Sequence, residues 1–318
     1  MRPHKGSTAV PSIQSHALSI DVEDYFHVHA FSAVIKEEHW SHYRGTLQRQ
    51  IPTLLDILDE FETKATFFVL GWVAEHYPAL VRECRVRGHE LASHGHAHQA
   101  IYLNGEEHFR ADVTRGKTIL EDLLGEPVLG YRAPGYSIVR STLWALPLLR
   151  ELGFVYDSSI FPIHHDYYGI PGARKTPFIL KPANSDLLDQ ITGRSSPVPH
   201  AREGHPSDYL VEFPIATLPI GRLNLPVSGG GYFRFWPYAF TRYALKKIER
   251  NVGPFVFYLH PWELCASLPN VRGAPPRSRI RTRLNTKGTE QKFRRLLQDF
   301  RFLPVKEVIR NLGLAFWE

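Results

Sequence analysis

Apolar and polar positions follow a regular order along the first half of the chain. Residues 17–22 form a short apolar run, and residues 47–61 place apolar side chains at helical spacing. A continuous apolar run at residues 65–70 predicts a buried strand, and Pro78 begins a further helix that we expect to end near Gly88. This order of strands and helices predicts parallel strands joined by helical crossovers.

The same order continues to about residue 156. We expect strands at 90–92, 128–131 and 154–156, and helices at 109–124 and 141–152. Both an α/β barrel and an open doubly wound sheet fit this order. No glycine-rich phosphate loop follows the first strand, which disfavours a nucleotide-binding open sheet.

The second half is less regular. Residues 161–208 are rich in Pro, Gly, Ser and charged side chains, which predicts an irregular insertion that acts as a lid or subsite loop. Order resumes at 209–213, and a glycine cluster with an aromatic run then leads to further elements at 237–250, 255–259, 289–300 and 304–312. We therefore expect a tail at residues 1–16, a barrel at 17–265 and a C-terminal helical extension at 266–318 packed on the barrel.

Composition restricts the class of protein. The 318 residues are 43% hydrophobic, enough for one large core. No run approaches the roughly 20 apolar residues of a membrane helix. Residues 1–16 lack the apolar core of a signal peptide, so we expect a cytoplasmic chain, with peripheral membrane association as the variant of that reading. The two cysteines imply no disulfide framework, and we expect both to be buried.

The net charge of +6 comes largely from a run of arginines late in the chain, at Arg277, Arg279, Arg281 and Arg283. We interpret this run as a solvated, flexible loop. Contact with an anionic glycan, a lipid phosphate or nucleic acid is the alternative, and no nucleic-acid-binding motif supports the last of these.

Four polar clusters each follow a predicted strand. They are Asp21-Val22-Glu23-Asp24, Ser93-His94-Gly95-His96-Ala97-His98, Arg132-Ala133-Pro134-Gly135-Tyr136 and His260-Pro261-Trp262-Glu263. In a parallel barrel the C-terminal end of every strand faces the same mouth, where catalytic groups collect. We therefore expect these carboxylates, imidazoles and guanidinium to meet.

The histidines and acids of these clusters predict a catalytic metal site. His94 and His98 are four residues apart, so one helical turn would place both rings on one face. Two imidazoles and one carboxylate leave positions for water and substrate. In an extended segment Asp21 and Glu23 share a face, which favours Glu23 as the ligand and Asp21 as a free base. We expect His96 to point elsewhere.

Arg132 and His260 complete the set of candidates. A guanidinium that leaves a buried strand needs an anionic partner, and we expect Arg132 to pair with Asp21 and orient it, the alternative being a surface salt bridge. His260 ends an apolar strand and is either a satisfied core histidine or, at the same mouth, a general acid.

With these motifs in order, the chain from about residue 17 to 262 resembles the NodB-homology polysaccharide deacetylases of carbohydrate esterase family four. His94 with His98 resembles the metal motif, with Gly95 where Ser or Thr usually stands. Arg132-x-Pro134 resembles the motif whose Arg tethers the catalytic Asp, and Leu259-His260 the motif with the catalytic His. The segments Tyr156-Asp157-Ser158-Ser159 and Ser228-Gly229-Gly230-Gly231-Tyr232-Phe233-Arg234 resemble a subgroup associated with exosortase/PEP-CTERM exopolysaccharide loci.

The resemblance implies a distorted (β/α) barrel and metal-dependent removal of N-acetyl groups from an N-acetylated glycan or lipid-linked saccharide. It implies a divalent metal, Zn²⁺ first and Co²⁺, Mn²⁺ or Ni²⁺ as alternatives, and leaves the carboxylate ligand open between Glu23 and Asp24. Asp21 would be the base and His260 the acid. A backbone N–H, that of Gly135, would stabilise the oxyanion, and the other substrate contacts would come from Tyr136, Leu259 and Trp262. The family's Asp/Trp motif is not plainly present, and Asp157 is the candidate to replace part of it.

Two rival functions fit the same barrel. One is hydrolysis of a small cyclic amide or ureide, as in allantoinase-like relatives, although the insertion and the aromatic run favour a sugar groove. The other is a non-catalytic glycan-binding protein, which we would expect to have lost the base or the acid. This chain keeps Asp21, Arg132, His94, His98 and His260.

Overall fold

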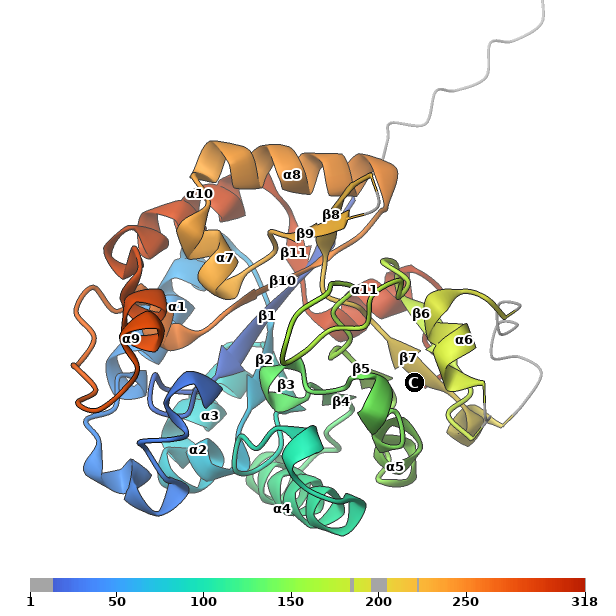
Figure 1. Cartoon of the computed structure of the whole chain (residues 1–318), viewed down its shortest axis with the longest axis horizontal. Helices are drawn as coiled ribbons and strands as arrows, with labels where there is room; N and C mark the ends of the chain where they lie inside the picture. The colour runs from blue at the N-terminus through green and yellow to red at the C-terminus, as the bar shows by residue number, and fades with distance from the viewer. Residues whose placement is uncertain (1–13, 184–185, 196–204, 222, 318) are drawn as a thin grey trace, which may run out of the picture.

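A curled sheet of mostly parallel strands forms the centre of the fold (Figure 1). The computed structural model describes residues 14–183, 186–195, 205–221 and 223–317. The strand order is β10-β1-β2-β3-β4-β5-β7-β6, with β11 also on β1, and only β6 runs antiparallel to its neighbour. The strands are β1 (His16–Val22), β2 (Thr66–Val69), β3 (Glu90–Ser93), β4 (Gly130–Tyr131), β5 (Tyr156–Asp157), β6 (Phe178–Leu180), β7 (Leu210–Glu212), β10 (Val256–Leu259) and β11 (Phe302–Leu303).

The sheet curls far enough that its two sides approach each other. Just beyond β7, Ile215 forms a parallel bridge with Val256 of β10, and its N–H donates to the carbonyl of Ile160. A separate hairpin, β8 (Thr217–Ile220) and β9 (Leu223–Pro226), follows this crossing point. The parallel order and the incomplete closure confirm the predicted α/β fold with a distorted barrel.

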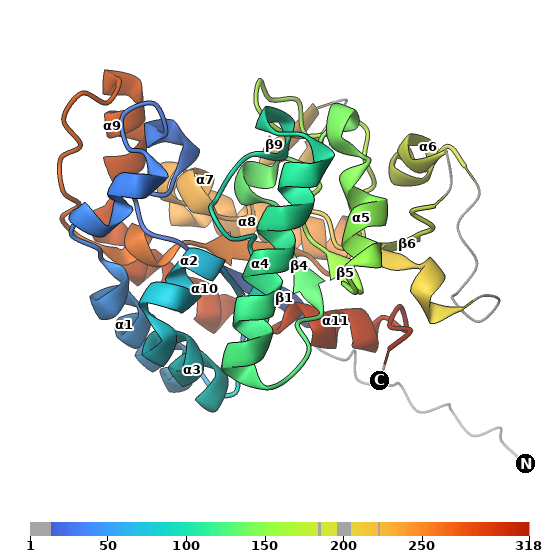
Figure 2. The ribbon, with the colours of Figure 1, turned by 90° about the horizontal axis from the view of Figure 1, so that it is seen from below.

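Helices surround the sheet on its outer side (Figures 1 and 2). Helix α1 buries the apolar face that the sequence predicts, including Leu47, Ile51 and Leu54. The helices are α1 (Leu47–Glu60), α2 (Gly71–His76), α3 (Pro78–Val86), α4 (Glu106–Leu124), α5 (Ala145–Glu151), α6 (Leu187–Thr192), α7 (Gly230–Phe235), α8 (Tyr238–Asn251), α9 (Pro276–Arg283), α10 (Thr289–Asp299) and α11 (Val305–Asn311).

The second half has more structure than its sequence predicts. The predicted irregular insertion contains β6 and α6 among its described residues, and the predicted basic loop is wrong because residues 276–283 form helix α9. These elements are short and depend on partners distant in sequence, so local periodicity does not identify them. Parts of the predicted tail (1–13) and insertion (184–185 and 196–204) lie outside the described residues.

The glycine cluster exists because two backbones approach closely. Gly229 has φ 145° and bridges to Tyr258 of β10. A Cβ at this position would lie 2.1 Å from the carbonyl oxygen of Tyr258, so any larger residue would push the segment away. Helix α7 begins directly after this contact and is thereby fixed against the sheet.

Both cysteines, Cys84 and Cys265, are free and buried, as the sequence predicts. Within the described part of the chain, no helix has both the length and the apolar character needed to span a membrane. The C-terminal part contributes β11 directly to the central sheet through its pairing with β1. The predicted domain boundary at residue 265 stays a prediction.

Candidate metal centre and active site

Three side chains from two strand ends form a candidate metal site. Glu23 follows β1, and His94 and His98 follow β3. One potential ligand atom from each lies within 4.8 Å of the others. Glu23 and His94 are buried, and the rings of His94 and His98 lie 5.4 Å apart. The structure thus brings together three of the four residues that the sequence nominates as ligands.

The loop that carries the histidines is not the helical turn that the spacing suggests, so that expectation is wrong. Gly95 has φ 73° and His98 has φ 50°, and these left-handed positions bend the chain so that both rings face Glu23. The carboxylate of Asp112 on α4 fixes the bend by accepting 2.9 Å hydrogen bonds from the N–H groups of His96 and Ala97. A Cβ on Gly95 would lie 2.7 Å from that carboxylate.

The tautomer of His94 and the charge of Glu23 suit the binding of a cation. His94 Nδ1 lies 2.8 Å from the carbonyl oxygen of Arg132, which can only accept, so Nδ1 carries the proton and Nε2 keeps its lone pair. Burial lowers the pKa of His94 to about 4. Burial opposes ionisation of Glu23, but the His98 and His260 rings outweigh it and hold its pKa well below the usual range.

Glu23 also shows an unmet need for a partner. Its buried Oε2 has the His98 ring as its polar neighbour, and that contact balances the charge of the carboxylate only when the ring is protonated. A buried carboxylate oxygen beside two imidazoles is costly unless a positive group satisfies it. The donor set of one carboxylate and two imidazoles is one that Zn²⁺ and similar divalent ions accept.

Asp24, the alternative carboxylate, does not join this cluster. Its Oδ1 accepts from the Thr46 hydroxyl at 2.9 Å, and its Oδ2 accepts from the N–H groups of Thr46 and Leu47. These donors belong to the first turn of α1, so Asp24 caps that helix from outside. The structure therefore places Glu23, and not Asp24, at the two histidines.

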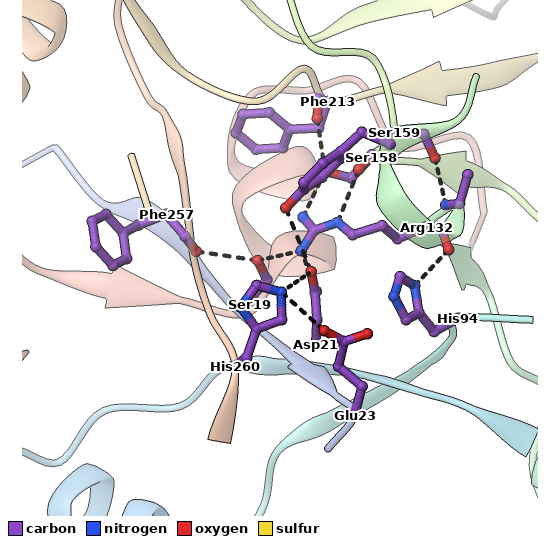
Figure 3. A network of polar contacts seen from close by, with 12 residues as sticks. Ser19, Asp21, Glu23, His94, Arg132, Ser158, Ser159, Phe213, Phe257 and His260 are labelled. Carbon is purple, nitrogen blue, oxygen red and sulfur yellow. Dashed lines mark hydrogen bonds and ion pairs between the residues drawn. The ribbon is translucent and has the colours of Figure 1, made fainter. Parts of the chain in front are cut away.

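Asp21 and Arg132 lie next to the metal cluster and form a buried ion pair (Figure 3). Arg132 Nη1 donates to Asp21 Oδ1 at 2.6 Å and to the hydroxyl of Ser19 at 2.8 Å. The other oxygen of Asp21, Oδ2, lies 3.4 Å from the hydroxyl of Tyr136 and 3.8 Å from His260 Nε2. Asp21 thus has one oxygen fixed and one turned toward the other candidate residues.

Arg132 is fully buried, so its remaining donors need acceptors as well. Its Nε donates to the carbonyl of Ser158 and its Nη2 to the Ser158 hydroxyl, both at 2.9 Å. The guanidinium also lies 4.1 Å above the ring of Phe68. Figure 3 shows this guanidinium between the strand that carries Asp21 and the segment that carries Ser158. Every face of Arg132 is occupied, which fixes Asp21 in position.

The His260 ring lies close to the carboxylates of both Asp21 and Glu23. Its Nε2 lies 3.4 Å from Glu23 Oε1, and its Nδ1 lies 2.9 Å from Glu263 Oε2. Burial opposes protonation of this ring, but the charges of Glu263, Glu23 and Asp21 outweigh it and raise the pKa of His260 to about 9. A protonated imidazole at this position can donate a proton to a leaving group.

The four residues predicted to contact the substrate lie in different surroundings. Gly135 is exposed at the mouth with φ 60°, and Tyr136 directs its hydroxyl at Asp21. Leu259 is fully buried beside His260. The Trp262 ring stacks on the His260 ring at 5.4 Å between centroids.

Other nominated residues lie elsewhere. His96 Nε2 contacts Glu75 at 3.1 Å, away from the three ligands. Asp157 is buried and its Oδ1 accepts from the Ser159 hydroxyl; burial raises the pKa of both Asp157 and its neighbour Glu212, and the charge of Asp157 raises the pKa of Glu212 further. Asp157 is thus hydrogen-bonded within its own segment.

Several residues that shape the site receive no individual role from the sequence. Ser19 was detectable, because it lies two residues before Asp21 on the same face of a strand. Glu263 was detectable too, because an acid three residues after a strand-ending His matches a capping pattern. Ser158 and Arg234 lie in the two segments that resemble the subgroup, but their contacts, like those of Asp112, are tertiary and gave them no role from the sequence.

Comparison with known families divides the chain into two matched parts. Residues 44–156 match the family model described as polysaccharide deacetylase. Residues 158–310 match a model described as a domain of unknown function, DUF3473. The first match ends at residue 156 and the second begins at Ser158. Ser158 is the residue that accepts hydrogen bonds from Arg132.

Curated relatives match a limited segment. A peptidoglycan-N-acetylglucosamine deacetylase of Bacillus cereus is 33% identical over 84 residues, which are 26% of this chain and 39% of that protein. A chitooligosaccharide deacetylase of Azorhizobium caulinodans is 31% identical over 84 residues, 26% of this chain and 40% of that protein. The chain thus spans about two fifths of the length of these relatives.

Solved structures match the fold along nearly the whole chain. A Mycobacterium smegmatis protein assigned as a polysaccharide deacetylase has a TM-score of 0.58 at 21% identity, covering 97% of this chain and 94% of that one. Puue allantoinase has a TM-score of 0.57 at 14% identity, covering 96% and 93%. At these identities the likeness concerns the fold. Residues 44–156 therefore form a region that matches the polysaccharide deacetylase family model, within a fold that nearly the whole chain shares with these solved structures.

Proposed function

We propose that this chain hydrolyses N-acetyl groups of amino sugars in a metal-dependent reaction. One observation carries the proposal: a Glu-His-His cluster, a buried Asp-Arg pair and a carboxylate-bound His meet at the C-terminal ends of β1, β3, β4 and β10. Catalytic groups gather at this end of parallel barrels. The retention of a base and an acid at this point supports an enzyme over a non-catalytic glycan-binding protein.

Glu23, His94 and His98 would hold the cation. When bound, a divalent ion such as Zn²⁺ supplies Lewis acidity toward the acetyl carbonyl and eases deprotonation of water. Asp21 accepts the proton of the water whose oxygen bonds to the acetyl carbon, because its Oδ2 is the oxygen not bonded to Arg132. The exposed backbone at Gly135 is the candidate donor to the developing oxyanion.

His260 acts on the leaving group. As the C–N bond breaks, its electron pair stays on the sugar nitrogen, and that nitrogen takes a proton from His260 Nε2. The products are acetate and a free amino sugar. Because Nε2 lies within 3.8 Å of Asp21 Oδ2, the base and the acid face one reacting centre.

The finer assignments are also proposals. The segments 156–159 and 228–234 favour an exopolysaccharide or its lipid-linked precursor as the acetylated substrate, in keeping with the exosortase-associated subgroup. Zn²⁺ is the proposed metal. We also propose residues 17–265 as the catalytic barrel and residues 266–318 as an extension packed on it.

Acetate release tests the proposal directly. The purified chain is assayed on N-acetylated chitooligosaccharides, an acetylated exopolysaccharide and allantoin, with and without a chelator and with Zn²⁺ restored. We expect acetate from a glycan, its loss with chelator and its recovery with metal. Turnover of allantoin alone would assign the small-amide function instead, and chelator-resistant acetate release would remove the metal from the proposal.

A further inference from the structure

The ring of His260 is fixed by a residue outside the metal cluster. Glu263 Oε2 accepts the His260 backbone N–H at 3.0 Å and lies 2.9 Å from His260 Nδ1. A carboxylate only accepts, so Nδ1 holds a proton and Nε2 is directed at the reacting centre. A carboxylate that fixes the tautomer and orientation of an imidazole is a recurrent arrangement at hydrolytic sites.

Glu263 in turn depends on Arg234 of α7. Arg234 Nε donates to Glu263 Oε1 at 2.6 Å, and both side chains are buried. A buried carboxylate needs such a cation, because an uncompensated one is strongly destabilising. The Arg234 guanidinium also lies 5.2 Å above the Trp262 ring, which stacks on His260. Arg234 therefore supports His260 through both a carboxylate and an aromatic ring.

The end of α9 and the turn after it hold Arg234 in place. Arg234 Nη1 donates to the carbonyl oxygens of Arg281, Thr282 and Leu284 at 3.1, 3.0 and 2.7 Å. The Asn285 side chain donates to the carbonyl of Arg234 at 3.0 Å. Lys292 on α10 donates to the carbonyls of Phe233, Arg234 and Trp236. Residues 281–292 thus enclose the C-terminal end of α7.

We propose that Glu263 is the positioning residue of His260 in deacetylation, and that residues 281–292 maintain it through Arg234. The inference rests on the proposed function, which makes His260 the acid. It gives a role to the region of unknown function, residues 158–310, because that region supplies the acid, its positioning carboxylate and the arginine that holds the carboxylate. This region completes the catalytic centre that the deacetylase region begins.

A pair of substrates separates positioning from a general structural role. An N-acetylated chitooligosaccharide loses an amine that must be protonated, whereas p-nitrophenyl acetate loses a phenolate that leaves without a proton. For Glu263→Gln we expect kcat on the glycan to fall by roughly 10²-fold, the lower end of the effect of losing acid catalysis, with KM unchanged. On the ester we expect a fall of less than about tenfold.

Arg234→Gln should show the same split between amide and ester. The matched control is Glu62→Gln, which changes an exposed acid in the turn after α1 and should alter neither rate. Equal losses on both substrates would overturn the positioning role of Glu263. A split in Glu263→Gln without one in Arg234→Gln would overturn the role of residues 281–292.

A failure of the proposed function can be told apart from a failure of the positioning role of Glu263. If the unaltered chain hydrolyses neither substrate, the proposed function fails, and the positioning is tested by crystal structures instead. In Glu263→Ala we expect the His260 ring to leave the position that it has in the unaltered protein. An unmoved ring would overturn the inference whatever the activity.

Discussion

The two halves of the molecule each hold one residue that we propose to transfer a proton, and each does so by means of a buried arginine, but in different ways. In the first half Arg132 contacts Asp21 directly, from one strand end to another. In the second half Arg234 acts through Glu263, and short helices and turns supply its acceptors. In the first half the ion pair joins residues at the ends of regular strands, so the strands themselves place the side chains. In the second half Glu263 lies in a short 3-10 turn, so its position depends more on the buried ion pair with Arg234.

This difference indicates where each half is sensitive. Asp21 sits in a β-strand paired on both sides, so its backbone is fixed independently of its charge. His260 begins a short 3-10 turn (Pro261–Leu264), where Glu263 and Arg234 provide the rigidity that a ladder provides elsewhere.

Removal of either proton-transfer group should have the largest effect. For Asp21→Asn and His260→Gln we expect kcat for acetate release to fall by roughly 10²–10⁴-fold, because each variant loses one proton transfer. Circular dichroism at the assay temperature checks that the fold persists. A kcat within tenfold of the unaltered enzyme would reject the role of the residue concerned.

Loss of either buried arginine should lower the free energy of unfolding by a similar amount. Arg132→Met and Arg234→Met each leave a buried carboxylate without its cation, so we expect the free energy of unfolding to fall by about 3–5 kcal/mol in each. Denaturant unfolding measures this. Arg250→Met, at an exposed position, is the control and should change it by less than about 0.5 kcal/mol. A neutral Arg234→Met would show that the second half does not rely on its ion pair.

Metal binding should depend on the first half alone. At a Zn²⁺ concentration 100 times the Kd, we expect the free energy of unfolding to rise by about 2.7 kcal/mol, because only the folded cluster binds the ion. His98→Ala should abolish the rise, and the exposed His108→Ala should keep it. Glu263→Gln should also keep it. Loss of the rise in Glu263→Gln would place the second half in the metal site.

The buried Asp157–Glu212 pair should give stability a pH dependence. Burial raises both pKa values above those of the unfolded chain, so the folded pair keeps a proton that the unfolded chain releases. Its stability contribution is therefore full below about pH 4 and declines as pH rises, by about 1.4 kcal/mol per pH unit for one proton. Glu212→Gln should remove that slope in unfolding measured between pH 5 and pH 7. Parallel slopes would contradict the shared proton.

Asp24→Ala should have the smallest effect. It distinguishes the helix-capping role of Asp24 from the metal-binding role of Glu23. Loss of a helix cap should lower the free energy of unfolding by about 0.5–2 kcal/mol. We expect the Zn²⁺ Kd, measured by titration calorimetry, to stay unchanged, whereas Glu23→Ala weakens binding. Equal weakening in both variants would return Asp24 to the ligand set.

The sequence predicts the first half of the site better than the second. Periodicity identifies the strands, and the rule that parallel strand ends share one mouth brings Asp21, Glu23 and Arg132 together. The spacing predicts a helical turn for the histidine loop, but Gly95 and His98 adopt left-handed backbone angles, and Asp112 holds the loop through hydrogen bonds to residues 15 and 16 positions away in sequence. Arg234 could not be found, since its acceptors are backbone carbonyls that exist only in the fold.

The guanidinium of Arg132 has a consequence for how this chain can be divided. It is bonded to Ser19 and Asp21 on one side and to Ser158 on the other, and Ser158 is the first residue of the second matched region. A fragment ending before Ser158 would leave two of its donors facing nothing. Exchange of either portion with that of a relative would therefore have to preserve these contacts, because Arg132 ties the two matched regions together.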